Sequence, residues 1–118
     1  MLTEERFKNY IQEMEKGTTC TEFLGKNKKL ILNIKKDSNA MKEYNTHKAL
    51  SNIKRYIIFK LLKNKPMCTC AIAKVFEVSD GTITHHLKIL EEAGLIIGKK
   101  EGYFTRYYTV EELVQKLS

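Results

Sequence analysis

The chain has 118 residues, of which 42% are hydrophobic and 30% are charged. This length and balance are typical of one globular domain with terminal extensions, and they exclude a disordered chain. No apolar run approaches the ~18 to 20 residues of a membrane span, and the acidic start of the chain is unlike a secretory signal. We therefore expect a cytoplasmic protein without a membrane partner.

The formal net charge is +7, and the excess of Lys and Arg is concentrated in residues 23–65. A polyanionic partner such as nucleic acid explains this charge, although a membrane surface or solubility alone gives the same value. The cysteine count of three is odd, and Cys68 and Cys70 are only two residues apart. Such a set argues against a disulfide framework and favours thiols that act as ligands or sensors.

The first part of the chain contains one clear helical pattern. Thr3 can cap a helix that ends near Gly17 and whose apolar residues fall at helical spacing, namely Phe7, Tyr10, Ile11 and Met14. The pattern then weakens: residues 30–34 fit a short strand or a helical turn, and residues 37–39 fit a loop. We expect a variable arm over residues 18–45.

Two helices are expected next. The first runs from about Thr46 to Asn64, and its apolar side consists of Leu50, Ile53, Ile57, Ile58, Leu61 and Leu62. Pro66 marks its end and can open the second, because proline is tolerated in a first turn but not in a helix interior. That helix covers about Met67 to Phe76 and presents Ile72, Val75 and Phe76 inward.

Residues 78–95 carry the most informative pattern. Ser79 is a suitable N-cap, and Ile83, Leu87 and Leu90 form a helical core stripe that ends at Gly94. Strands at residues 95–97 and 104–109 then flank a polar, glycine-containing turn at 99–102. A last helical stripe follows over Val110 to Leu117.

Two helices joined by a short turn and followed at once by a hairpin have the order of a winged helix-turn-helix. The predicted fold is mainly α with a small β-hairpin wing, an α+β arrangement. We expect residues 1–45 to form an N-terminal helix and arm used for dimerisation. Residues 46–118 form the winged-helix DNA-binding domain with a C-terminal dimerisation helix.

The second helix of this motif enters the major groove in such proteins, and the hairpin lies along the backbone. The polar face of this second helix is either merely solvated or contacts the bases and phosphates of double-stranded DNA. The hairpin that follows the helix favours the DNA-binding interpretation. Wing cations add phosphate or minor-groove contacts. The predicted DNA-binding residues are Ser79, Thr82, Thr84, His85, Lys88, Lys99, Lys100 and Arg106.

Several other residues are expected to have structural roles only. His86 lies on the core side of its helix and is expected to pack rather than to bind a ligand. The wing aromatics are expected to be core or strand-pairing residues, namely Tyr103, Phe104, Tyr107 and Tyr108. Because no phosphate loop, paired-carboxylate cleft or nucleophile motif appears, we predict that the protein is not an enzyme.

From about Lys48 to Thr109 the sequence resembles the ArsR family of arsenic- and metal-responsive repressors. The matching pieces are Ala-Leu-Ser at 49–51, Lys-Arg-Tyr-Ile-Ile at 54–58, the segment 79–90, and Glu-Ala-Gly-Leu-Ile at 92–96. The resemblance implies a homodimer whose first and last helices form the interface. The residues expected there are Phe7, Tyr10, Ile11, Met14, Leu113 and Leu117.

The segment Met67-Cys68-Thr69-Cys70 resembles a cysteine motif of the same family. A helix N-terminus lowers thiol pKa, and thiolates bind soft ions such as As(III), Cd(II), Pb(II), Zn(II) or Cu(I). Residues two apart on a helix point away from each other, so both reach one ion only at a frayed or distorted first turn. A redox pair and inert buried cysteines remain alternatives.

Two thiols rarely complete a metal site. Some arsenic sensors carry a third cysteine three residues further on, where this chain has Ala73, and an acidic residue is replaced by Ala71. Cys20 is the remaining candidate, since an N-terminal thiol reaches across the dimer in related sensors. The family's other metal site lies on the last helix and needs His, Asp or Glu at set spacings. Glu111 and Glu112, without a histidine, do not match it.

These observations predict a homodimeric repressor that binds a pseudo-palindromic operator and is released when a soft ion or an oxidant engages Cys68 and Cys70. Ligand binding is expected to stabilise a dimer geometry that misplaces the two DNA-contacting helices. One alternative keeps DNA binding but removes metal sensing, giving a redox-sensing or constitutive regulator. Another is a protein-interaction module whose basic face meets an acidic partner.

Overall fold

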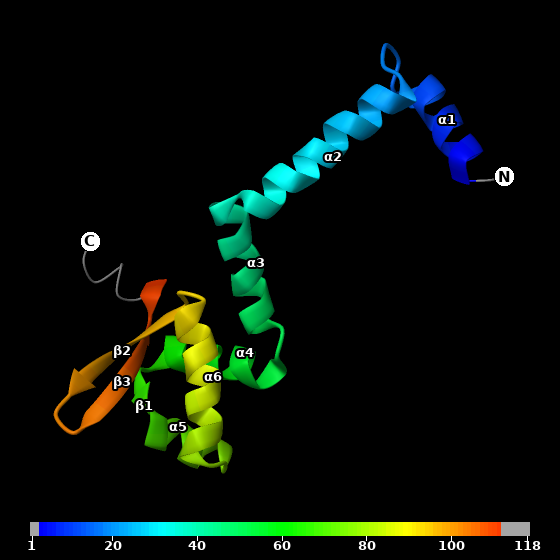
Figure 1. The fold of residues 1–118 in the computed structure, drawn as a ribbon. Coiled ribbons are helices and arrows are strands. Elements are labelled where there is room, and N and C mark those ends of the chain that lie inside the picture. Colours follow the sequence, from blue (N-terminus) through cyan, green and yellow to red (C-terminus); the bar gives the residue numbers. More distant parts are fainter. Residues whose placement is uncertain (1–2, 112–118) are drawn as a thin grey trace. The chain divides into compact units, whose positions relative to one another are not determined.

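The structure is a computed structural model that describes residues 3–111 (Figure 1). It divides into two compact units, Met1–Met41 and Lys42–Ser118. The C-terminal helix predicted for residues 110–117, including Leu113 and Leu117, lies almost entirely outside the described residues. Within the described part, no helix is both long and apolar enough to cross a membrane.

The first unit contains two helices, α1 (Thr3–Met14) and α2 (Cys20–Lys36). Of the two predictions for residues 30–34, a short strand and a helical turn, the helical one is confirmed, because α2 runs unbroken through them. Thr19 caps this helix by accepting a hydrogen bond from the Glu22 N–H at 3.1 Å. Lys and Leu, which recur along α2, are strong helix formers and favour its helical conformation.

The two helices meet through aromatic rings. The ring of Phe23 on α2 lies 5.8 Å from that of Phe7 and 6.3 Å from that of Tyr10, measured between centroids. Ile11 beside them is buried. Part of the predicted dimer stripe therefore has a partner inside its own unit.

A pair of helices follows, α3 (Ser38–Leu50) and α4 (Ile53–Asn64). The loop predicted at 37–39 shrinks to Asp37, whose Oδ1 accepts the Asn39 N–H at 2.9 Å. The single helix predicted over residues 46–64 is also wrong. It breaks because the Asn52 side chain accepts the Arg55 N–H and caps α4.

Pro66 precedes a short strand, β1 (Met67–Cys68), and α5 (Thr69–Phe76) begins only after it. The prediction that Pro66 opens a helix is wrong because residues 67 and 68 pair with a strand of the wing. Glu77 ends α5 in a left-handed conformation, with φ of 57°. Ser79 then caps α6 (Asp80–Glu92), as predicted.

The wing consists of β2 (Ile96–Glu101) and β3 (Phe104–Thr109), which form an antiparallel hairpin beside α6 (Figure 1). The turn predicted at residues 99–102 is wrong in its bounds, because Lys99, Lys100 and Glu101 pair with β3 and only residues 102 and 103 make the turn. Gly102 takes a φ of 66° there, which suits glycine. The sheet order is β1-β3-β2, and β1 pairs with β3 at Met67↔Tyr107 and Cys68↔Arg106.

The core of the second unit gathers apolar side chains from α3, α4, α5, α6 and β2, namely Ala49, Ile58, Leu62, Ile72, Ala73, Ile83, Leu87, Leu90 and Ile96. Some predicted core residues are exposed instead. Ile53, Ile57 and Val75 fall outside the buried stripes of their short helices. Tyr103 is exposed because it lies in the turn of the hairpin, whereas Phe104, also exposed, pairs with Glu101 as one of the predicted strand-pairing residues.

Candidate nucleic-acid interface and thiol pair

The helix α6 has one buried and one exposed side. Ile83, Leu87 and Leu90 are at most 1% exposed. The polar residues predicted to read DNA are all exposed, namely Thr82, Thr84, His85 and Lys88. The sequence pattern therefore identified which side of this helix the second unit leaves open.

Hydroxyl groups organise the first turns of α6. The Ser79 hydroxyl accepts the Thr82 N–H at 3.2 Å and lies 2.9 Å from the Thr82 hydroxyl. The Thr84 hydroxyl donates to the Asp80 carbonyl at 2.8 Å. Because the Thr84 proton is already used, this hydroxyl can only accept hydrogen bonds from a further partner.

The two histidines of α6 have different surroundings. His85 is exposed, whereas His86 is buried as predicted, and its Nδ1 finds no hydrogen-bond partner among the described residues. Burial lowers the pKa of His86, and the positive charge of Arg55 lowers it further. His86 is therefore a neutral packing residue, and only His85 faces solvent.

The wing lysines lie on opposite faces of the hairpin. Successive side chains of a strand point to opposite sides, so Lys99 and Lys100 cannot face the same surface. The ammonium of Lys99 lies 5.8 Å from the centroid of the Tyr108 ring. Lys100 is exposed on the other face.

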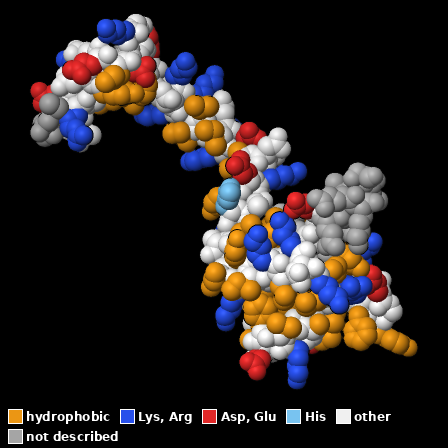
Figure 2. Space-filling model, turned by 180° about the vertical axis from the view of Figure 1, so that it is seen from behind, with side chains coloured by type: hydrophobic (Ala, Val, Ile, Leu, Met, Phe, Trp, Pro, Cys, Tyr) orange, Lys and Arg blue, Asp and Glu red, His pale blue; other side chains and the backbone are white. Residues whose placement is uncertain are grey.

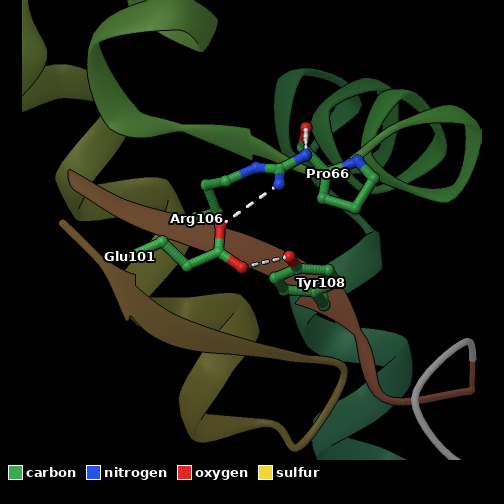
Figure 3. A network of polar contacts seen from close by, with 4 residues as sticks. All are labelled: Pro66, Glu101, Arg106 and Tyr108. Atoms are coloured by element: carbon green, nitrogen blue, oxygen red, sulfur yellow. Dashed lines mark hydrogen bonds and ion pairs between the residues drawn. The ribbon is translucent and has the colours of Figure 1, made fainter.

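Arg106 takes part in a polar network within the wing (Figure 3). Its guanidinium donates to Glu101 Oε2 at 3.1 Å and to the Pro66 carbonyl at 3.5 Å. The Tyr108 hydroxyl donates to Glu101 Oε1 at 2.6 Å. The hydrogen bond from Tyr108 has the largest effect in lowering the pKa of Glu101, and the bond from Arg106 lowers it further. We predicted Arg106 as a DNA contact and Tyr108 as a core or strand-pairing residue, and nothing in the sequence indicated that Glu101 binds both.

Cys68 and Cys70 lie together at the start of α5. Their sulfur atoms are 2.9 Å apart, and all three cysteines of the chain are free thiols. Cys68 reaches its neighbour because it is the extended N-cap residue and not part of the helix. The sequence argument that the pair can meet only at a distorted first turn is consistent with this geometry.

The two thiols differ in acidity. The hydrogen bond between the two thiols lowers the pKa of Cys68, and the backbone N–H of Ala71 in the first turn of α5 lowers it further. The same hydrogen bond raises the pKa of Cys70. Cys68 is therefore the more acidic of the two thiols and ionises first.

A groove of about 570 Å³ opens beside the pair. Its apolar lining includes Pro66, Ala71, Val75 and Phe104, and Arg106 and Glu101 also border it. Cys20 opens α2 in the first unit. No group of three or more His, Cys, Asp or Glu side chains that could hold a metal ion occurs among the described residues.

The first unit carries exposed apolar side chains. Met14 is 68% exposed and Tyr10 47%, and α2 exposes Leu24, Leu30, Ile31, Leu32 and Ile34. On the face of the molecule in Figure 2, such hydrophobic side chains (orange) lie among Lys and Arg side chains (blue). This unit therefore offers an apolar surface bordered by charged side chains of both signs.

The sequence and the fold match known regulators. Residues 52–97 match the family described as "Bacterial regulatory protein, arsR family". An uncharacterised HTH-type transcriptional regulator of Methanocaldococcus jannaschii is 39% identical over 71 residues, which are 59% of this chain and 80% of that protein. The arsenical resistance operon repressor of Bacillus subtilis is 35% identical over 71 residues, 59% of this chain and 68% of the relative.

A solved structure adds the same assignment from the fold. The homodimeric winged helix-turn-helix DNA-binding domain of a Mycobacterium bovis protein has a TM-score of 0.62 and 28% identity, covering 68% of this chain and 74% of that one. The helices α5 and α6 and the wing supply the winged helix-turn-helix of such regulators. This chain therefore belongs to the arsR family of bacterial transcriptional regulators.

Proposed function

We propose that this protein is a dimeric repressor that reads double-stranded DNA with α6 and is released from its operator when a soft ion binds the thiol pair. The observation that carries the DNA-binding part is the division of α6. Its buried side anchors the helix in the core, and its exposed side presents Thr84, His85 and Lys88 next to a basic wing. A rigidly anchored helix with a polar outer face is what major-groove reading requires.

Individual contacts follow from the hydrogen bonds within α6. Ser79 and Thr82 lie at its N-terminus, where backbone N–H groups favour a phosphate. His85 and Lys88 have side chains long enough to reach base edges, and Thr84 offers an acceptor and a methyl group. Lys99, Lys100 and Arg106 are the phosphate contacts of the wing, with Arg106 the weakest because Glu101 already neutralises it.

Dimerisation is supported by the homodimeric relative and by the exposed apolar side chains of the first unit. We assign the interface to Phe7, Tyr10, Met14, Leu113 and Leu117, with Met14 and Tyr10 the most accessible of those described, and we leave out Ile11 because it is buried within its own unit. A two-fold dimer places two copies of α6 about one helical turn apart on DNA. The operator is then an inverted repeat.

The effector is a soft metal or metalloid ion, one of As(III), Cd(II), Pb(II), Zn(II) or Cu(I). Support comes from the adjacent sulfurs of Cys68 and Cys70 and from the likeness to an arsenical resistance repressor. For a bare ion that prefers three thiolates, Cys20 of either protomer is the remaining thiol of the chain. Thiolate ligation must release protons, so affinity rises with pH until the thiols ionise.

The first experiment selects duplexes from a random-sequence pool with the reduced protein and footprints the selected DNA. The proposal predicts a sequence-selective, two-part footprint with inverted symmetry. Failure to enrich any duplex would favour a protein-interaction module with a basic face. Enrichment followed by release with a disulfide-forming oxidant but with none of the ions would favour a redox regulator instead.

A further inference from the structure

Helix α2 carries an apolar stripe that its own unit leaves largely open. At 3.6 residues per turn the stripe follows one side of the helix over its whole length and is about 120° wide. Its members are Cys20, Phe23, Leu24, Asn27, Leu30, Ile31 and Ile34. The rings of Phe7 and Tyr10 on α1 contact the stripe at Phe23. The leucines and isoleucines of the stripe are between 42% and 51% exposed.

The first unit needs a further surface to be stable. Ile11 is the one buried residue of α1 and α2 among those described. Short helices are marginal in water on their own and depend mainly on the packing of an apolar face. The unit also lies outside residues 52–97, the segment that matches the family.

We propose that α2 pairs with α2 of a second copy, and that the two helices run antiparallel with Asn27 at their centre. This inference rests on the dimer of the proposed function and adds α2 to its interface.

The stripe has the same spacing in both directions from Asn27. Leu24 and Leu30 lie three residues away from it, Phe23 and Ile31 lie four away, and Cys20 and Ile34 lie seven away. In a two-fold interface, residue i of one copy meets residue j of the other, and j meets i. If Asn27 lies on the axis of an antiparallel pair, every member of the stripe therefore faces another member of the stripe.

Charge also favours the antiparallel direction. The helix contains five lysines and one glutamate, and Lys35 and Lys36 lie in its last turn. At the other end, Glu15 precedes the helix and Glu22 lies in its first turn. An antiparallel pair places the lysine end of each helix beside the acidic end of the other. A parallel pair brings the two lysine ends together, where they repel.

Asn27 favours a protein partner over a lipid surface. Its Nδ2 donates to the Phe23 carbonyl at 2.9 Å, which leaves one amide hydrogen and the amide oxygen for a further partner. On the two-fold axis this amide faces its own counterpart, and the two side chains can exchange hydrogen bonds. A polar residue at one core position also fixes the register of paired helices. Within lipid the same amide would lose its water without gaining a partner, which is costly.

Self-association is tested with two neighbouring residues that are similarly exposed. Ile31→Asp places a carboxylate in the stripe and is expected to weaken the dimer about tenfold, because the charge becomes buried between the helices. Leu32→Asp is the control. Leu32 is 55% exposed, compared with 51% for Ile31, but it points away from the stripe, so this variant should associate like the wild type. Equal dissociation constants for the two variants in sedimentation overturn the inference.

A disulfide cross-link tests the direction and register of the pair. In a full-length chain with Cys68 and Cys70 replaced by Ser, Ile34→Cys adds a thiol that faces Cys20 of the other copy. We expect mild oxidation to give a covalent dimer joined between these two positions. Within one helix the positions are about 21 Å apart, too far for a disulfide.

The control for the cross-link is Asn33→Cys in the same background, because Asn33 is exposed and points away from the stripe. This variant should remain uncross-linked. A disulfide between the two Cys20 residues in the background chain alone would show a parallel pair and overturn the inference.

The two proposals fail differently. A cross-linked dimer that selects no duplex keeps the α2 pair and refutes DNA reading. A two-part footprint, together with an Ile31→Asp variant that associates like Leu32→Asp, keeps the dimeric regulator and removes α2 from its interface. Binding to phosphatidylglycerol vesicles that Ile31→Asp abolishes, without any cross-link, would assign the stripe to a membrane surface and overturn the inference.

Discussion

Cys68 lies directly opposite Arg106 where β1 pairs with β3, so one thiol of the pair belongs to the same sheet as the wing. Arg106 also bonds to Glu101 on β2 and to the Pro66 carbonyl next to β1 (Figure 3). If bridging of the sulfurs shifts β1, the wing must shift with it or lose these bonds. The sheet is thus a direct connection between the proposed sensor and a proposed DNA contact.

Replacing Arg106 tests this connection. In Arg106→Gln we expect a smaller ratio between operator affinities without and with the effector, because the side-chain bonds from Arg106 to Glu101 and to the Pro66 carbonyl are lost. Binding titrations at several salt concentrations measure this ratio together with the salt dependence. A variant whose salt slope falls by about 1 while the ratio stays unchanged would show that Arg106 is a phosphate contact only.

Base reading by α6 is tested at His85. His85→Ala is expected to cost about 1 to 3 kcal/mol on the selected duplex and little on unrelated DNA, because a base contact carries sequence information. Competition binding against scrambled duplexes measures the difference. The matched control is His47→Ala, an exposed histidine on α3, which should bind like wild type. Equal losses for the two variants would contradict the assignment of α6.

The buried His86 predicts a pH dependence of stability. Because its pKa is lowered from the ordinary 6.5, the unfolded chain binds protons more readily, and stability is lost as pH falls through 6.5 toward the folded-state value. We expect the free energy of unfolding to fall less between about pH 7.5 and 5 in His86→Leu than in wild type. Denaturant titrations at each pH measure this, with His47→Leu as the exposed control. Parallel pH curves for wild type and His86→Leu would contradict a neutral, buried His86.

Self-association is tested at exposed positions of the first unit. Ile11 is unsuitable, because it is buried within its own unit and a charge there would unfold α1 from α2. Met14→Asp leaves that contact intact and is expected to weaken a dimer that forms at about micromolar concentration. Sedimentation of wild type and variant measures this. A wild-type monomer at that concentration would rule the dimer out, and an unaffected dimer would move the interface away from Met14.

The parts of the fold that the sequence predicted well depend on neighbouring residues. Ser79 caps α6, the stripe from Ile83 to Leu90 is buried, and the hairpin turns at Gly102. Each of these signals lies within one or two turns of chain. The same locality explains why the two cysteines could be placed at the start of α5.

The errors arose where a pattern was absent or contacts were distant. The helix α2 buries none of its residues, so periodicity gave no clear signal. The cap formed by Asn52 divides the helix predicted over residues 46–64. The cap formed by Asp37 starts α3 where a loop was predicted at 37–39. The hydrogen bonds of Arg106 to Glu101 and to the Pro66 carbonyl depend on strand pairing between distant parts of the chain, which no local pattern encodes.

The central claim is that soft-ion binding at Cys68 and Cys70 releases DNA. Release of the selected duplex by As(III), Cd(II) and Zn(II) should be measured side by side for wild type, Cys68→Ser and Cys20→Ser under reducing conditions. The account predicts that at least one ion weakens DNA binding of the wild type. It also predicts that Cys68→Ser binds DNA normally but no longer responds, while Cys20→Ser loses much of the response to a bare ion. Normal ion-induced release from Cys68→Ser would contradict it.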